Sequence, residues 1–373
     1  MNFFNERKAA AVFKHALLGS YLTPFAMKTG SASPNNEVAF IDGYAGAGRY
    51  EDGSDGSPAL VLSTARSLAP HRKLKAYFVE ADSQTLAKLN LLVNDRGNGL
   101  DVRTFHGEIT DHISQLLTLT TNIPTFTFMD PFGLAVPFET IVSLFKRQTG
   151  GRIPISEALI NFTAVGLRRI AGHLTSATPS EATLCRMDNV CGGNWWREAW
   201  LNSLPDREKA ELAVVEGYMH RLSKAAGSGG WTTEVRNKRH HKPVYYLVFL
   251  SRHFDGLALY GESQSIALEK WRKHLYEVDN DGTLFSSEED FKAAEVELKE
   301  AWISEIQENL QRLLQEKGAF IVGENYADTF GEALGKARTL HLRKAWKNLH
   351  AIGLTQTNSM GDILNKKIER TRN

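Results

Sequence analysis

Three consecutive residues have the types and the order that amine chemistry requires. Asp130, Pro131 and Phe132 directly follow a mainly apolar run, 126–129. In amine methylation a carboxylate and a proline carbonyl accept the two N–H bonds, which aims the nitrogen lone pair at the methyl group, while an aromatic ring stacks on a flat acceptor. Because an acid after apolar residues is costly to place without a partner, this segment predicts a catalytic group.

A second segment has the composition of a loop that approaches a ligand closely. Glycines let the backbone turn sharply and leave its N–H groups free to donate. A plain strand-to-loop turn would also use glycine, and this segment alone leaves both readings open. The predicted cofactor contacts here are Asp42, Gly43, Tyr44, Gly46 and Gly48.

Two further acids follow the next two strand-like runs. Glu80 ends the second run, where a carboxylate can accept hydrogen bonds from both hydroxyls of a ribose. Glu108 follows the third, in a position to face an adenine edge. Taken singly, each of these acids could be a solvated carboxylate in a surface turn. Because both follow the glycine loop in the order expected of a cofactor site, we favour an adenosine-containing cofactor.

The spacing after the glycines narrows the choice of cofactor. A dinucleotide-binding motif starts its helix at once, so that the helix N-terminus faces a pyrophosphate. Here residues 49–56 intervene before a predicted helix start, with Ser57 as N-cap and Pro58 at the first helical position. The loop argues against a pyrophosphate and for a zwitterionic cofactor, and we expect S-adenosyl-L-methionine.

Short apolar runs separated by helical patterns must position these residues. This alternation predicts an α/β fold with a doubly wound, Rossmann-like parallel sheet. A later run, 244–250, is apolar throughout and is expected to be buried on both faces. Asn161 and Arg169, after the fifth run, could line the acceptor side of the crevice, although for Arg169 a surface ion pair is favoured. The first five runs are 38–41, 75–79, 102–105, 125–129 and 158–162.

The pattern also predicts how the chain is divided. Residues 1–36 are expected to form an N-terminal helix and linker, and 37–275 the α/β domain, with an inserted, Trp-rich helical cap at about 180–230. Residues 286–373 start with a long helix that ends at Gly318 and continue into a helical or winged-helix-like module.

Amino-acid composition limits the binding partners, metal sites and cellular compartment that we expect. Lys and Arg total 44 and Asp and Glu 43, a net charge of +1, so an electrostatic footprint must be local. Cys185 and Cys191 are too few for a disulfide framework or a zinc site, and we predict no bound metal. The start lacks a signal-peptide pattern, and no long apolar run suggests a membrane span, which favours the cytoplasm.

Two basic segments are candidates for phosphate contacts, although such runs are often only solvated faces. One is the loop 236–242, and the other is 336–373, which holds nine Lys or Arg against Asp362 and Glu369. The expected nucleic-acid contacts are Arg236, Lys238, Arg239, Lys242, Arg343 and Lys347.

Five segments, in order, resemble the three-Cys-motif partner proteins, over roughly the first two-thirds of the chain: FIDGYAGAGRYEDGSDGSPAL, YFVEAD, FMDPFG, ALINFTAVGLRR and VYYLVFLSRH. The resemblance implies a class I methyltransferase-like fold and a radical-type iron–sulfur partner that bears the three-cysteine motif. It also implies that Asp42, Gly43, Gly46 and Gly48 contact the cofactor, that Glu80 holds its ribose and that Asp130 lies at the reaction centre. DPFG lacks the second proline of the familiar amino-methyltransferase tetrad.

The sequence therefore predicts an S-adenosylmethionine-dependent methyltransferase acting on an exocyclic amine of a nucleic-acid base, in DNA or RNA. One alternative is a catalytically silent scaffold that binds and regulates the three-cysteine partner enzyme. Another is a methyltransferase for a small molecule or a protein. Fold alone does not decide between these functions.

Overall fold

The computed structural model describes residues 8–50, 53–134, 136–147, 154–280 and 288–371. The chain divides into two compact units, Met1–Leu257 and Ala258–Asn373, and each is described by itself. The sequence-based division, which separates the modules at 275–286, remains a prediction. Within the described residues, no helix is both long and apolar enough to cross a membrane.

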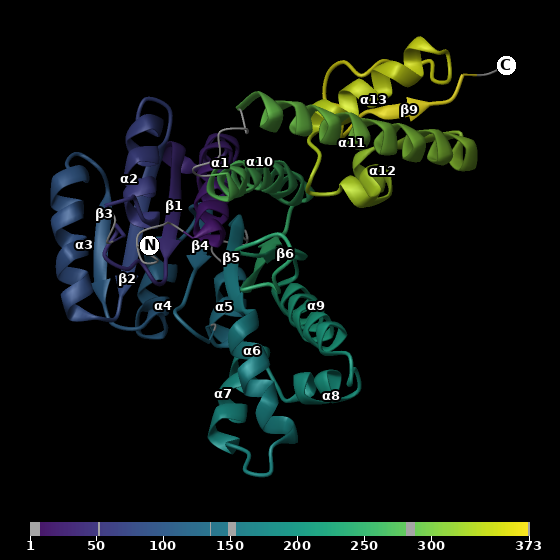
Figure 1. The fold of residues 1–373 in the computed structure, drawn as a ribbon. Coiled ribbons are helices and arrows are strands. Elements are labelled where there is room, and N and C mark those ends of the chain that lie inside the picture. The colour runs from purple at the N-terminus through teal and green to yellow at the C-terminus, as the bar shows by residue number, and fades with distance from the viewer. Residues whose placement is uncertain (1–7, 51–52, 135, 148–153, 281–287, 372–373) are drawn as a thin grey trace. The chain divides into compact units, whose positions relative to one another are not determined.

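The first unit is built on one seven-stranded sheet with the order β3-β2-β1-β4-β5-β7-β6 (Figure 1). Strands β1 to β5 run parallel, and β7 is antiparallel to both β5 and β6. The predicted doubly wound α/β fold is confirmed. The strands are β1 Glu37–Asp42, β2 Lys73–Glu80, β3 Val102–His106, β4 Thr125–Met129, β5 Ser156–Thr163, β6 Gly229–Val235 and β7 Tyr245–Ser251.

The strand order places a crevice at one edge of the sheet. The chain winds outward from β1 to β3 and then returns to add β4 on the other side of β1. Asp42 is in register with Phe128, so Asp42 and Asp130 lie at the carboxyl ends of neighbouring strands. In open α/β sheets this switch point is where ligands bind.

Helices cover both faces of the sheet (Figure 1). Because successive strand residues point to opposite faces, Ile41 and Ile160 join the core under α4 to α9, whereas Phe126 and Phe249 meet Tyr21 of α1 on the other face. The helices are α1 Ala9–Gly30, α2 Ser57–Leu68, α3 Ser83–Arg96, α4 Ile109–Leu119, α5 Phe138–Phe145, α6 Ala164–Ala171, α7 Glu181–Cys191, α8 Trp195–Leu201 and α9 Arg207–Ala226.

The Trp-rich insertion is part of this core. Trp196, Trp200 and Tyr218 are buried in the same apolar cluster as the sheet. Strand β6, which follows α9, was not predicted, because it begins with two glycines and reads as a loop.

The second unit is helical with a small sheet. It contains most of α10 (Phe254–Asp279), then α11 (Glu288–Lys317), α12 (Tyr326–Phe330) and α13 (Thr339–Ala351). Strands β8 (Ala319–Ile321) and β9 (Lys367–Glu369) pair antiparallel.

The apolar face of α11 packs against α13 in the core of this unit. Ile306 and Leu310 of α11 are buried there in one cluster with Leu342 and Trp346 of α13. Gly318 follows α11 with φ +72°, as expected of a glycine that ends a helix. The winged-helix description of the module remains a prediction.

Candidate functional site

A cleft of about 710 Å³ opens where β1 and β4 end. Its lining includes Tyr44, Gly46, Gly48 and Tyr50 of the loop after β1, and Asp130 and Phe132 of the segment after β4. The structure thus brings the predicted glycine loop and the predicted catalytic segment together. Its volume is in the range of small-molecule and cofactor sites.

Gly48 of the glycine loop is harder to replace by another residue than Gly46. Gly46 and Gly48 both have positive φ, +63° and +79°. A Cβ on Gly48 would lie 2.3 Å from Leu92 Cδ2, whereas a Cβ on Gly46 would meet nothing within 4 Å. Gly48 therefore lets the loop lie against α3, and Gly46 leaves open space in the cleft wall.

Asp42 lies behind the cleft lining and is fully buried. Its carboxylate accepts hydrogen bonds from the Ser57 hydroxyl (2.7 Å) and the Tyr44 backbone N–H (3.1 Å). Burial raises the pKa of Asp42 to about 7, against the lowering effect of these two donors. Asp42 thus orders the loop from behind.

The predicted role of Ser57 as N-cap is wrong. Gly56 occupies the N-cap, and Ser57 is the first residue of α2, with its hydroxyl turned to Asp42. A buried carboxyl group that needs donors accounts for this orientation.

Glu80 and Glu108 are not among the residues that line the cleft. The Glu80 carboxylate accepts from the backbone N–H groups of Gly46 and Asp82, both at 2.8 Å, and so braces the glycine loop. Glu108 is exposed at the N-cap of α4, where its backbone N–H donates to Asp111 (3.2 Å). Their expected contacts with ribose and adenine remain predictions.

Asp130 is held by two side chains from distant parts of the chain. Lys14 of α1 forms an ion pair with Oδ2, and the Asn161 amide donates to Oδ1 at 2.7 Å. The Lys14 and Asp130 side chains are only 13% and 19% exposed. The sequence analysis named Asn161 but missed Lys14, whose one signal is its place between the apolar residues Phe13 and Leu17 of a helix.

The two residues after Asp130 differ sharply in exposure. Pro131 is buried, whereas Phe132 is 102% exposed, an unusual position for a phenylalanine. Phe132 also lines the cleft. Its ring is accessible for stacking beside the Asp130 carboxylate.

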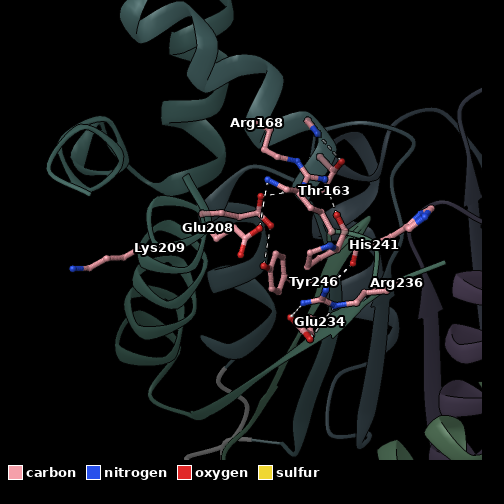
Figure 2. A network of polar contacts seen from close by, with 12 residues as sticks. Thr163, Arg168, Glu208, Lys209, Glu234, Arg236, His241 and Tyr246 are labelled. Carbon is pink, nitrogen blue, oxygen red and sulfur yellow. Dashed lines mark hydrogen bonds and ion pairs between the residues drawn. The ribbon is translucent and has the colours of Figure 1, made fainter. Parts of the chain in front are cut away.

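The basic loop 236–242 lies at the same edge of the sheet, because it leads into β7, whose Tyr245 pairs with Thr163 at the end of β5. Figure 2 shows Arg236 turned back onto Glu234, with N···O distances of 3.1 and 2.9 Å. Lys242 pairs with Glu208 at 3.5 Å. Lys238 and Arg239 are exposed.

Arg168 fastens this loop, whereas its neighbour Arg169, a candidate for the acceptor side of the crevice, is exposed. Arg168 donates to the Pro243 carbonyl at 2.7 Å and pairs with the buried Glu211 at 3.3 Å, while Tyr246 donates to Glu211 at 2.9 Å (Figure 2). These residues border a hollow of about 220 Å³. The network fixes the base of the loop.

In the second unit the two predicted phosphate contacts differ. Arg343 donates to the Gly361 carbonyl at 2.7 Å and also to that of Ser359, so it ties a loop to α13. Lys347 is exposed on the same helix. The prediction that both contact a nucleic acid stays untested.

No protein-family model matches the chain, and no curated protein matches its sequence. Solved structures similar to the chain include the O-methyltransferase TomG from Streptomyces achromogenes, in complex with SAM (10% identity, TM-score 0.34, covering 67% of this chain and 93% of that one). Another is precorrin-6y C5,15-methyltransferase from Geobacter metallireducens (11% identity, TM-score 0.28, covering 62% and 86%). At these identities the likeness concerns the fold alone, which the strand order establishes by itself.

Proposed function

We propose that the protein is an S-adenosylmethionine-dependent methyltransferase that methylates an exocyclic amine of a nucleic-acid base. The observation that carries this proposal is the pairing of a held carboxylate, Asp130, with a fully exposed aromatic ring, Phe132, at one cleft with a glycine loop. A carboxylate that accepts an amine N–H beside a ring that stacks on the base is the minimum arrangement for orienting such an acceptor.

The chemistry of the lining fits the cofactor. Arg49 and Lys88 supply positive charge and Asp95 and Asp130 negative charge, which suits a zwitterion. Helix α2 begins at Ser57, nine residues after Gly48; its N-cap Gly56 donates to the Gly48 carbonyl at 2.9 Å, and both Gly56 and Ser57 line the cleft. When bound, the cofactor supplies a methyl group already activated by its sulfonium.

The chain's own residues would orient the acceptor. Asp130 accepts one amine N–H, the Pro131 carbonyl accepts the other, and Phe132 covers the flat face of the base. Lys238 and Arg239, exposed at the same edge of the sheet, would contact phosphates. Lys347, exposed on α13, is a separate candidate for a phosphate contact. No covalent intermediate on the protein is required.

A second candidate is the catalytically silent scaffold for a radical-type three-cysteine enzyme. It rests on the resemblance of the five segments to the three-Cys-motif partner proteins, which does not by itself require transfer.

Calorimetric titration with S-adenosylmethionine and its demethylated product distinguishes the two candidates. We expect wild type to bind both and Glu80→Ala to bind neither, because this substitution removes the brace of the glycine loop. Glu37→Ala is the matched control, since Glu37 is an acid at the opposite end of β1, paired with Lys75 at 2.9 Å.

Transfer of labelled methyl to DNA and RNA oligonucleotides then tests the acceptor. Asp130→Ala should bind the cofactor but lose transfer. If wild type binds neither compound, the enzyme proposal is wrong and the scaffold is favoured.

A further inference from the structure

Asp130 lines the cleft, and Lys14, which is not among the lining residues, forms an ion pair with it from α1, so a hydrogen-bond donor lies directly beside this acceptor. A lysine ammonium has three N–H donors, and Asp130 takes one of them. Each carboxylate oxygen can accept a second hydrogen bond in addition to those from Lys14 and Asn161. The pair therefore keeps both a donor and an acceptor for a ligand.

Lys14 is fixed more firmly than an ordinary surface lysine. Ala10, one helical turn before it, accepts from the Tyr245 hydroxyl at 2.6 Å and donates from its backbone N–H to Asn237 at 3.2 Å. The Tyr245 ring centroid lies 5.7 Å from the Lys14 ammonium, within cation–π range. The sheet and the basic loop together thus set the position of the ammonium.

Asn161 supports the same geometry from β5. Its amide nitrogen donates to Asp130, and its buried Oδ1 has no hydrogen-bond partner. A buried acceptor without a hydrogen-bond partner costs free energy. Asn161 keeps this orientation, and its amide nitrogen holds the Asp130 carboxylate.

A protein donor next to a protein acceptor recognises the edge of a heterocycle at which an acceptor lies beside a donor. An amide side chain recognises adenine in this way, by accepting from its exocyclic amine and donating to the neighbouring ring nitrogen. The same edge, an amine next to an unprotonated ring nitrogen, occurs in adenine and cytosine but not in uracil, thymine or hypoxanthine.

We propose, on the basis of the methyltransferase function above, that the acceptor subsite takes this amidine edge. The amine donates to Asp130, and the adjacent ring nitrogen accepts from Lys14. Lys14 is then a specificity-determining residue, and the ion pair selects a neutral heteroaromatic amine.

Deaza bases test this assignment, because they keep the amine and lose one ring nitrogen. The probes are oligonucleotides with adenine, 1-deazaadenine or 7-deazaadenine at one position, a matched set with cytosine or 3-deazacytosine, and the corresponding free nucleosides. We measure kcat/KM for wild type, Lys14→Met and Lys14→Arg, with thermal unfolding of each. Lys14→Leu, which also lacks a donor, replaces Lys14→Met if the latter does not fold.

In wild type, removal of the ring nitrogen that Lys14 contacts should lower kcat/KM at least tenfold. Lys14→Met should methylate the parent base as poorly as wild type methylates the deaza base, with the difference between the two bases lost. Lys14→Arg, which keeps a donor, should retain part of the discrimination. Activity on oligonucleotides alone identifies a polynucleotide acceptor, and activity on nucleosides a small-molecule one, and either supports the subsite.

The inference is overturned if Lys14→Met discriminates parent from deaza base as wild type does, or if the methyl group goes to an oxygen or carbon acceptor. It is also overturned if wild type binds the cofactor but methylates none of the probes. Failure to bind the cofactor at all would instead overturn the proposed function itself.

Discussion

Two aspartates at the ends of neighbouring strands are held in opposite ways. Asp42, after β1, is buried and bonded to neutral donors at most 15 residues away, Ser57 and the Tyr44 N–H. Asp130, after β4, is bonded to Lys14 and Asn161, which are 116 and 31 residues away. In the half of the cleft formed by the glycine loop, the Asp42 carboxyl group is therefore held by nearby chain, although the loop beside it is also braced by Glu80, 34 residues from Gly46. In the other half, Asp130 instead gathers side chains from α1 and β5 around a charge.

This difference separates structural from chemical roles. A buried carboxyl group without a bonded cation is costly to ionise, and the pKa of Asp42 is raised accordingly. A carboxylate paired with a lysine and partly exposed to a cleft can instead accept further hydrogen bonds. The following predictions test whether the two halves divide the work in this way.

The largest effect is expected from Asp130→Ala. If Asp130 orients the amine as proposed, loss of its side chain removes the hydrogen-bond acceptor, and methyl transfer should fall at least about 100-fold, equivalent to about 3 kcal/mol of transition-state free energy. Cofactor binding measured by calorimetry should change little.

Asp42→Asn is the control one strand away, because it removes the charge of the neighbouring aspartate and leaves an oxygen that can still accept from the Tyr44 N–H. It should keep most of the transfer rate. Equal losses of rate in both variants would remove the distinction between the two halves.

The glycine loop offers a second contrast. Gly48→Ala combines a positive φ with a collision against Leu92 and should lower the free energy of unfolding by about 3 kcal/mol. Gly46→Ala has the same kind of φ but open space, and should cost about 1 kcal/mol. Urea denaturation of both variants measures the difference, and a similar loss in each would mean that contact with α3 does not shape the loop.

The local half of the cleft was the predictable one. Glycines, strand-end acids and apolar runs follow one another in the sequence, so the strands β1 to β5 and the glycine loop could be located from the pattern alone. The details that failed depend on burial. Ser57 reads as a helix cap until Asp42 is seen to be buried behind it. The brace that Glu80 forms with Gly46 was likewise not expected from the sequence, while its ribose contact remains a prediction.

The Asp130 half of the cleft depends on contacts between residues that are far apart in the sequence, and no local sequence pattern contains them. Lys14 lies on a helix that reads as a separate N-terminal element, yet α1 packs on the sheet through Tyr21 and brings Lys14 to Asp130. Likewise, Arg168 and Arg169 are indistinguishable in sequence, and only the position of α6 over Glu211 and Pro243 selects Arg168.

The pH dependence of stability provides a smaller but distinctive effect. From about pH 4 to about pH 7 the folded protein keeps the Asp42 proton and the unfolded chain has lost it, so Asp42 makes the free energy of unfolding fall as pH rises. Above that window both states are ionised. Asp42→Asn lacks this fall. Between pH 5 and pH 7.5 its free energy of unfolding, measured by urea denaturation, should therefore rise by about 2 kcal/mol relative to that of wild type.

Glu157, whose pKa burial also raises to about 7, gives wild type a second falling contribution that the variant retains. The variant should therefore still lose stability with rising pH, but less steeply. A pH dependence identical to that of wild type would show that Asp42 is stabilised as a carboxylate by groups other than Ser57 and Tyr44.

The smallest effect is expected from Phe132→Ala, which removes a ring without disturbing any packing. Because the ring is fully exposed, the free energy of unfolding should stay within about 0.5 kcal/mol of wild type. Stacking on a base contributes about 1 to 2 kcal/mol, so KM for an oligonucleotide should rise roughly 5- to 30-fold. Phe132→Trp, which keeps a stacking surface, should retain the wild-type KM, and a KM unchanged by the alanine would mean that the acceptor approaches Asp130 from another side.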